Sequence, residues 1–157
     1  MQLVKPDENQ LVTMMKWFSN EQEVKSWAGP KFRYPYNQQS FREDLNHNFT
    51  SSWSLISQQK ILLAFGQYYL RLGKCHLGRL VVNPEFRGQG FISYLMEGIC
   101  ELGMNELAVE SCSLVVLEQN ESAKIAYEKF GFLVEDYPGS NPLERCLYMV
   151  KHNESLK

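Results

Sequence analysis

Apolar residues recur along this chain with two different spacings, and the change of spacing separates a helical first part from a strand-rich middle. In the first fifty residues, after a short strand-like run over residues 2–5, they recur mainly at helical spacing. From residue 52 to residue 82 they form three longer runs, SWSLIS, ILLAFGQYYLRL and CHLGRLVV, separated only by residues 58–60 and 73–74. Connections that short predict antiparallel hairpins, so we expect three successive antiparallel strands.

The first part is predicted to hold three short helices. The first begins at about Asp7 and keeps one apolar face, formed by Leu11, Met14, Met15 and Phe18. Ser19-x-x-Gln22 has the form of a capping box and predicts a second helix that ends before Gly29. Ser40-x-x-Glu43 has the same form and predicts a third helix, with apolar residues at Phe41, Leu45 and Phe49.

The second half of the chain alternates helices and strands. An amphipathic helix continuing past Gly103 is predicted by Ile92, Leu95, Met96 and Ile99. The run CSLVVLE (residues 112–118) is almost wholly apolar, which is typical of a central strand, parallel to the one that ends at Val82. NESAKIAYEKFG (residues 120–131) opens on an Asn and closes on a Gly, as a capped helix does. Two last strands are predicted at FLVE (residues 132–135) and RCLYMVK (residues 145–151).

This order of elements predicts a protein of the α/β class in its mixed (α+β) form. We expect one domain over residues 1–157, with a mixed, mostly antiparallel sheet of about seven strands, a central parallel pair and four to five flanking helices. Hydrophobic residues make up 44% and charged residues 22%, an ordinary globular composition.

Charge and cysteine usage narrow the function classes. A net charge of −2 argues against a nucleic-acid partner, and no apolar run approaches membrane-spanning length, which argues against a membrane partner. The four cysteines, Cys75, Cys100, Cys112 and Cys146, form no C-x-x-C pair, so we expect reduced thiols and a cytoplasmic location. The three histidines are scattered, which leaves little to build a metal site, and we expect none.

The segment VVNPEFRGQGFISYLM (residues 81–96) turns a strand into a helix through a junction with unusual residues. Gly88 and Gly90 leave room for a ligand to approach the backbone, and the first turn of a helix offers unpaired N–H groups and positive potential. Arg87 adds a full charge, and the combination suits a pyrophosphate. Two other interpretations stay open here: the glycines turn the chain only, or GQGFIS is a Rossmann fingerprint. The intervening residues 83–87 weaken the second, because a Rossmann strand runs almost directly into its first glycine.

Two segments resemble the motifs of the GNAT N-acetyltransferase superfamily. LVVNPEFRGQGFIS (residues 80–93) is similar to its motif A, a strand with V-x-P followed by R/Q-x-x-G-x-G/A. LEQNESAKIAYEKFGF (residues 117–132) is similar to its motif B, which holds an Asn, a later Tyr and then Gly-Phe, here Asn120, Tyr127, Gly131 and Phe132. The resemblance covers the chain from about Trp53 to Val150 and implies a GNAT-like fold. Ile92 departs from the family, which usually has Gly or Ala at that place.

The resemblance implies acetyl-CoA as co-substrate and a set of residues that bind it. The backbone of Leu80, Val81 and Val82 would hold the acetyl-pantetheine arm and polarise the thioester carbonyl. The pyrophosphate would lie against Arg87, Gly88, Gln89, Gly90, Phe91, Ile92 and Ser93. Asn120 would contact the cofactor arm, and capping of its helix is an equal and compatible role.

The resemblance also makes Tyr127 the general acid that protonates the leaving CoA thiolate. The residues alone leave another interpretation open, because a tyrosine on an amphipathic helix is usually a core side chain.

The general base has three candidates. Counting by twos along the strand places His76 on the same side as Leu80 and Val82, and some arylalkylamine-acetylating members of the family carry a histidine at a similar place. A surface or sheet-end histidine without a catalytic role is the alternative. Glu118, at the end of the parallel strand, is the second candidate, and Glu85, which also suits a plain surface turn, is the third.

We therefore expect an acetyl-CoA-dependent N-acetyltransferase that acetylates a primary amine on a small molecule or a peptide. The transfer would be a direct attack in a ternary complex, because no cysteine has the setting of a nucleophile. The alternative is an acyl-CoA-binding module with little or no catalysis. The aromatic-rich segment KSWAGPKFRYPYN (residues 25–37) would line an acceptor pocket or pack over the sheet. The sequence does not identify the acceptor and leaves a homodimer open.

Overall fold

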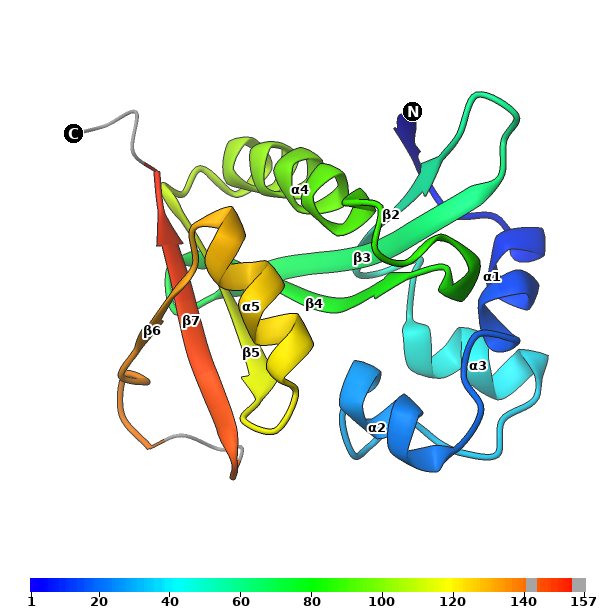
Figure 1. Cartoon of the computed structure of the whole chain (residues 1–157), viewed down its shortest axis with the longest axis horizontal. Coiled ribbons are helices and arrows are strands. Elements are labelled where there is room, and N and C mark those ends of the chain that lie inside the picture. The colour runs from blue at the N-terminus through cyan, green and yellow to red at the C-terminus, as the bar shows by residue number, and fades with distance from the viewer. Residues whose placement is uncertain (141–143, 154–157) are drawn as a thin grey trace. The chain divides into compact units, whose positions relative to one another are not determined.

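The computed structural model of this protein describes residues 1–140 and 144–153 (Figure 1). Its strands are β1 (Gln2–Val4), β2 (Ser51–Ile56), β3 (Leu62–Arg71), β4 (Lys74–Val82), β5 (Ser111–Leu117), β6 (Leu133–Glu135) and β7 (Cys146–His152). Its helices are α1 (Glu8–Met15), α2 (Glu21–Ala28), α3 (Gln38–Leu45), α4 (Phe91–Leu107) and α5 (Glu121–Phe130), with a short 3-10 helix at Pro84–Phe86.

The strands form one mixed sheet in the order β1-β2-β3-β4-β5-β7-β6. β4 and β5 are parallel, whereas β1–β2, β5–β7 and β6–β7 are antiparallel. This confirms the predicted mixed α/β class, with its parallel pair inside the sheet. The chain divides into two compact units, one made of residues 1–67 and 79–95 and the other of residues 68–78 and 96–157.

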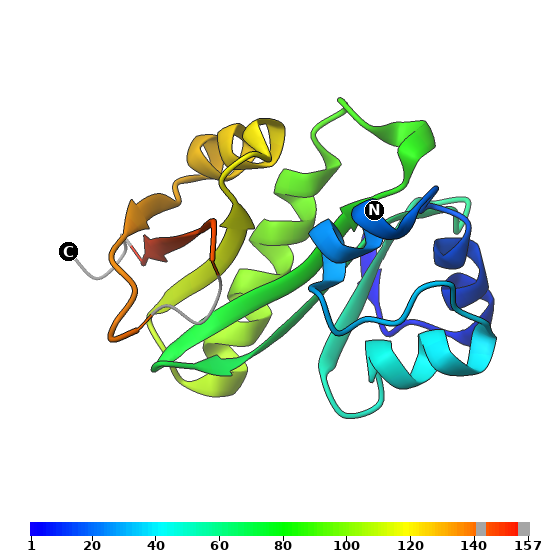
Figure 2. The same cartoon turned by 90° about the horizontal axis from the view of Figure 1, so that it is seen from below.

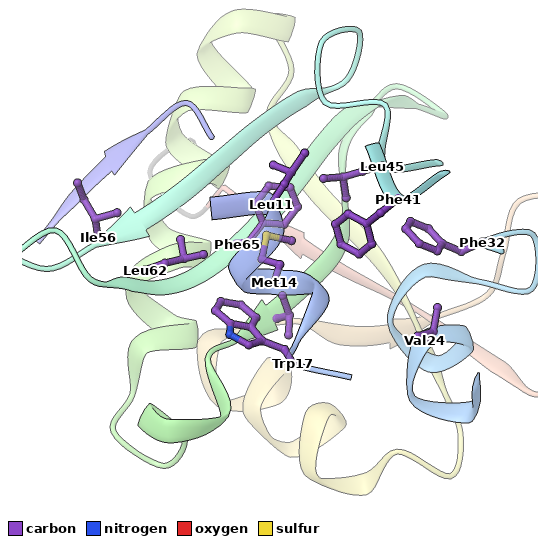
Figure 3. Close-up of a cluster of buried hydrophobic side chains, with 11 residues drawn as sticks. Leu11, Met14, Trp17, Val24, Phe32, Phe41, Leu45, Ile56, Leu62 and Phe65 are labelled. Carbon is purple, nitrogen blue, oxygen red and sulfur yellow. The ribbon is translucent and has the colours of Figure 1, made fainter. Parts of the chain in front are cut away.

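The first unit holds helices α1 to α3 over a hydrophobic cluster (Figure 3). α1 supplies Leu11 and Met14, α3 supplies Phe41 and Leu45, and β3 supplies Phe65. These five side chains are almost fully buried, and each contributes on the order of 2 kcal/mol of hydrophobic stabilisation relative to an exposed side chain. α1 begins where the sequence predicts, because Asp7 forms a complete capping box with Gln10.

The second unit is built around β5, which pairs with β4 on one side and with β7 on the other. Figures 1 and 2 agree that α5 lies over one face of β5 and β7. Gly103 of α4 has no room for a side chain, because a Cβ there would collide with Cys75 and lie 3.1 Å from the ring of Tyr68. This close approach explains a glycine in the interior of a long helix.

The second helix has a different cap from the one predicted. Its cap is Asn20, whose side chain accepts the backbone N–H of Glu23 at 2.9 Å. Ser19 lies outside the helix, and its own N–H donates to the Glu23 carboxylate at 2.8 Å. The predicted box of Ser19 and Gln22 is therefore wrong by one residue, because an adjacent Asn caps a helix as well as a Ser does.

The third helix begins earlier and ends earlier than predicted. Asn37 is the cap, and Ser40 is the third helical residue, whose hydroxyl accepts the Asn37 N–H at 3.1 Å. The helix ends at Leu45 because Asn46 adopts a left-handed conformation with φ of 54°. Phe49 is consequently off the buried face and 89% exposed, contrary to the prediction.

Candidate active site

The junction after β4 is attached to β3 by one buried side chain, that of Asn83. Its amide donates to the carbonyl oxygen of Leu62 at 3.0 Å, and its backbone N–H donates to the carbonyl of Leu63 at 2.8 Å. Its side-chain oxygen accepts the N–H of Glu85 at 3.0 Å and so starts the 3-10 helix. Sequence analysis did not single out Asn83, although Asn before Pro is a recognised turn signal.

The loop that follows has the backbone geometry of an anion site. Gly88 and Gly90 have φ of 79° and 80°, a region that residues with a Cβ rarely adopt. A Cβ on either glycine would find no atom within 4 Å, so the space over the loop is open. α4 starts at Phe91, directly after the second glycine, and the N–H of Ser93 donates to the Gly90 carbonyl at 3.2 Å.

The charges at this loop also fit an anion. Arg87 is exposed, and among the described residues it forms no ion pair. The first N–H groups of α4 have no acceptor within the helix, and the helix dipole adds positive potential there. The residues present therefore fit a pyrophosphate. The turn also requires glycines at these positions. Turning the chain and leaving room for a ligand are therefore compatible roles for Gly88 and Gly90. Ile92, which departs from the family pattern, is half-buried and leaves the loop open.

The strand before the junction is interrupted at Arg79, which has a φ of 51° within β4. After it, Val81 is buried in the hydrophobic cluster, whereas Leu80 and Val82 are half-buried. A left-handed residue in a strand breaks the alternation of side chains. Counting by twos from His76 to Val82 therefore does not hold across Arg79.

Tyr127 lies on α5, which is held in place by caps at both ends. The side chain of Asn120 accepts the N–H of Ala123 at 3.4 Å, so its capping role is established. At the other end Gly131 has a φ of 119°, and the carbonyl of Tyr127 accepts the N–H groups of Gly131 and Phe132. The signals that predict this helix are thus the ones that form it.

The Tyr127 side chain has the properties of a proton donor. The ring packs edge-to-face on Phe132, with centroids 6.4 Å apart. Desolvation by burial raises the pKa of Tyr127 to about 12. Its hydroxyl makes no hydrogen bond within the described part of the chain. The phenol is therefore protonated at neutral pH and free to donate to a ligand.

His76 is a buried residue, so the interpretation as a surface histidine is wrong. It is 4% exposed, and its Nδ1 lies 2.8 Å from the hydroxyl oxygen of Ser113. The ring also packs against Tyr69, with centroids 5.3 Å apart. Desolvation, and secondarily the charge of Arg71, lowers the pKa of His76 to about 4. The imidazole is therefore neutral at physiological pH and a weak base.

The two base candidates of the second unit do not lie together. His76 pairs with Ser113 near the start of β5, whereas Glu118 follows the end of that strand. Five residues of strand at ~3.3 Å each separate Ser113 from Glu118 by roughly 16 Å. Glu118 is exposed, and its N–H donates to the carbonyl of Arg145 at 2.8 Å. Glu85, in the other unit, is exposed on the 3-10 helix.

The aromatic-rich segment packs over the helices of the first unit. Phe32 is buried, and its ring lies 5.3 Å from that of Phe41 and 5.4 Å from that of Trp27. The Tyr36 hydroxyl donates to the carbonyl of Met15 at 2.6 Å, and burial raises the pKa of Tyr36 to about 12. Tyr34 is half-buried and packs edge-to-face on Tyr36. Packing thus accounts for Phe32, whereas Tyr34 keeps an accessible face.

Other kinds of site find little support within residues 1–140 and 144–153. No group of three His, Cys, Asp or Glu side chains there is arranged to hold a metal ion. In the same part of the chain, no helix has the length and apolar character needed to cross a membrane. All four cysteines are free, and Cys75, Cys100 and Cys112 are buried.

Comparison with known proteins identifies the family and the fold of this chain. Residues 21–132 match the family model described as the acetyltransferase (GNAT) family. PaiA N-acetyltransferase from Thermoplasma acidophilum, solved in complex with coenzyme A, is 20% identical, with a TM-score of 0.68 over 96% of this chain and 98% of that one. Spermidine N-acetyltransferase from Vibrio cholerae, solved with CoA and spermine, is 18% identical, with a TM-score of 0.70 over 97% and 95%. A GNAT-family acetyltransferase from Bacillus anthracis is 16% identical, with a TM-score of 0.76 over 97% and 94%. At these identities the likeness shows a shared fold.

Proposed function

This chain belongs to the GNAT acetyltransferase family, a family of acyltransferases, and we propose that it moves the acetyl group of acetyl-CoA to a primary amine. The acceptor would be a small molecule or a peptide, and the amine would attack the thioester directly in a ternary complex. The observation that carries the proposal is the open loop from Arg87 to Ser93, with its two left-handed glycines, at the start of α4. We treat residues 1–157 as one such acetyltransferase domain.

Binding of acetyl-CoA is assigned to the backbone on either side of the junction. Arg87 and the N–H groups of Gly88, Gln89, Gly90, Phe91, Ile92 and Ser93 would hold the pyrophosphate. The backbone of Leu80, Val81 and Val82 would hold the pantetheine arm and stabilise negative charge on the thioester oxygen. Asn120 would add a contact to the arm beside its role as a cap.

Tyr127 is assigned as the general acid. When the bond to sulfur breaks, the leaving thiolate needs a proton, and the Tyr127 phenol, which is protonated at neutral pH, would give it. Because its pKa of about 12 lies above that of a thiol, it would be a weak acid in this role. A thiol pKa of about 8.5 makes the thiolate a tolerable leaving group, so Tyr127 would accelerate the reaction without being essential.

Removal of a proton from the amine is assigned to His76 or Glu118. For a lysine-like amine with a pKa of about 10.4, presenting the neutral form at pH 7 costs ~4.6 kcal/mol. An α-amino group with a pKa of about 8 mostly avoids this cost. Because burial keeps His76 neutral and hard to protonate, Glu118 at the exposed end of β5 is the better placed of the two to pass a proton to solvent. Glu85 stays a third candidate on its exposed turn.

None of the described residues stands out as a strong base, and this favours one second candidate, an acyl-CoA-binding module with little or no catalysis. Both functions predict that CoA binds, and only the enzyme releases free CoA from acetyl-CoA when an amine is present. The test is thiol release with a panel of amines. Spermidine and spermine come first, because the Vibrio cholerae protein acts on the former and its structure contains the latter. Amine-dependent release supports the enzyme, whereas CoA binding without release supports the module.

The proposal also covers the cellular compartment of the protein and its oligomeric state. Four free cysteines support a cytoplasmic location, where thiols stay reduced. Fractionation of cells that express the tagged chain tests this location. A homodimer is compatible with the proposed function, and light scattering with and without acetyl-CoA measures it.

A further inference from the structure

Arg79 is held in a strained conformation by two groups of contacts in the first unit. Its φ of 51° lies in the left-handed region, which an arginine adopts only when its surroundings impose it. Its carbonyl accepts the indole N–H of Trp27 at 2.9 Å, so this backbone group is bonded to α2. The residue lies directly before Leu80, Val81 and Val82, the backbone segment to which the proposed function assigns the thioester.

The guanidinium of Arg79 is bonded to the end of α3. Its Nη1 donates to the carbonyl oxygens of Asp44 at 2.8 Å and Leu45 at 3.1 Å, which belong to the last turn of that helix. The last carbonyls of a helix have no partner within it and carry its negative dipole end, so a cation suits them. The same nitrogen donates to the Gln67 side chain at 3.2 Å, and the guanidinium lies 5.5 Å from the centre of the Phe32 ring.

The partners of Arg79 are themselves fixed. Gln67 is buried, and its amide donates to the Leu45 carbonyl and to the Ser52 hydroxyl, both at 2.8 Å. Arg33 binds the Asp44 carboxylate twice. The backbone N–H of Arg33 donates to it at 2.8 Å, and the guanidinium of Arg33 also donates to it. Bonds from α2, α3 and β3 therefore converge on one residue of β4, at the position where its strand geometry breaks.

We infer that Arg79 is a positioning residue, which fixes the backbone of Leu80–Val82 for the acetyl transfer by anchoring the left-handed break in β4 to Trp27 and to the end of α3. This inference rests on the proposed function for the role of Leu80–Val82. Glycine at position 79 would allow the break without any anchor. With arginine, the hydrogen bonds of the side chain offset the strain of the left-handed backbone. Losing these hydrogen bonds should therefore also destabilise the left-handed conformation at position 79.

Three substitutions at position 79 separate the anchor from general stability. Arg79→Ala removes the guanidinium and keeps a Cβ, which resists the left-handed conformation. Arg79→Gly removes the guanidinium but adopts that conformation freely. Arg79→Lys keeps the charge and one donor group. We expect kcat to fall on the order of 10- to 100-fold in the alanine variant, less in the glycine variant and least in the lysine variant.

The affinity for CoA and the melting temperature distinguish positioning from damage to the fold. The dissociation constant for CoA should change by a smaller factor than kcat in all three variants, because the pyrophosphate loop, which would hold another part of CoA, is untouched. Glycine normally weakens a strand relative to alanine, but here Arg79→Gly should melt above Arg79→Ala. Amide hydrogen exchange of residues 80–82 should be faster in Arg79→Ala than in the wild type.

Trp27→Phe carries the test if Arg79→Ala does not fold, because it keeps an aromatic ring at this position and removes the N–H that donates to the Arg79 carbonyl, together with part of the indole ring system. Trp53→Phe is the matched control, since the buried indole nitrogen of Trp53 has no partner among the described residues. We expect kcat to fall by about 3- to 10-fold in the first variant and to stay unchanged in the second.

Three results would overturn the inference. One is wild-type kcat together with wild-type exchange in Arg79→Ala. Another is an equal loss of kcat, CoA affinity and melting temperature in Arg79→Ala and Arg79→Gly, which would make Arg79 a stabilising residue only. The third is an equal effect of the two tryptophan substitutions. A wild-type protein that binds no CoA and acetylates no amine would instead refute the proposed function, and the exchange of residues 80–82 would still decide whether Arg79 anchors this segment.

Discussion

The side-chain amide of Asn83 donates a hydrogen bond of 3.0 Å to the carbonyl oxygen of Leu62, and this bond ties the end of β4 to the beginning of β3. Asn83 is only 8% exposed, so the bond is shielded from water. The loop proposed to bind pyrophosphate starts from this fixed point.

Asn83→Asp should therefore destabilise the protein and weaken CoA binding. The substitution keeps the acceptor for the Glu85 N–H but places a carboxylate oxygen opposite the Leu62 carbonyl. A buried acceptor without a donor costs about 1–3 kcal/mol, more for a charged group. Urea unfolding measures the stability and calorimetry measures CoA binding. Asn48→Asp makes the same change at an exposed asparagine of the same unit and is the control. A similar loss in both variants would contradict the role of Asn83.

Gly90→Val should abolish most of the thermal stabilisation that acetyl-CoA confers, because a branched side chain would occupy the open space over the loop and strain a residue with φ of 80°. Gly73→Val is a close control, since Gly73 also has a positive φ, 74°, and open space, but lies in the turn between β3 and β4. Both variants should lose stability, and only the first should lose CoA binding. Wild-type affinity in Gly90→Val would show that the loop is assigned wrongly.

Arg87→Ala should raise the KM for acetyl-CoA more than it lowers kcat. The side chain is exposed, so its attraction to a phosphate is screened by salt, and the difference between variant and wild type should shrink as ionic strength rises. Initial rates at low and high salt measure this difference. Lys31→Ala removes another exposed charge of the same unit and should leave KM unchanged. Equal KM values for Arg87→Ala and the wild type would count against the contact.

Tyr127→Phe should lower kcat on the order of 10- to 100-fold and leave the KM for acetyl-CoA nearly unchanged, because general acid catalysis is lost while the ring remains. With a pKa of about 12, Tyr127 should also cause no fall in kcat between pH 7 and pH 10 in the wild type. Tyr148→Phe removes a different hydroxyl of the same unit, a buried one without a partner among the described residues, and should keep wild-type kcat. Full kcat in Tyr127→Phe, at a step shown to be chemistry, would return Tyr127 to a packing role.

His76 should make the stability of the protein depend on pH. Its pKa is lowered from 6.5 to about 4, so between these values the unfolded chain binds a proton that the native state does not. The free energy of unfolding should therefore fall as the pH drops through this window, by on the order of 3 kcal/mol in total.

Urea unfolding between pH 4 and pH 7 measures this dependence. His76→Asn should flatten it, since asparagine does not titrate, and the difference from the wild type isolates His76 from the carboxylates. The same pH dependence in His76→Asn and the wild type would contradict a lowered pKa.

Much of the fold and the turn at Gly88 and Gly90 could be predicted from the sequence, because their signals are local. Asn120 and Gly131 mark the two ends of α5, and both cap it in the structure. The short links at residues 58–60 and 73–74 limited β2, β3 and β4 to successive strands. Gly88 and Gly90 adopt the positive φ that a residue without a Cβ permits. Where two local signals competed, as at Ser19 and Asn20, the sequence did not decide between them.

What the sequence by itself determined was the order of elements and the turn at Gly88 and Gly90, since each depends on residues close together in the chain. The almost wholly apolar run over residues 112–118 indicated a central parallel strand but did not fix its register. Tertiary structure alone decided the burial of His76 and the break at Arg79. The partner of His76 is 37 residues away, and the indole that binds the Arg79 carbonyl is 52 residues away. Desolvation and hydrogen bonds to such distant partners set the pKa of a side chain and hold a strained backbone, and no periodicity in the sequence encodes them.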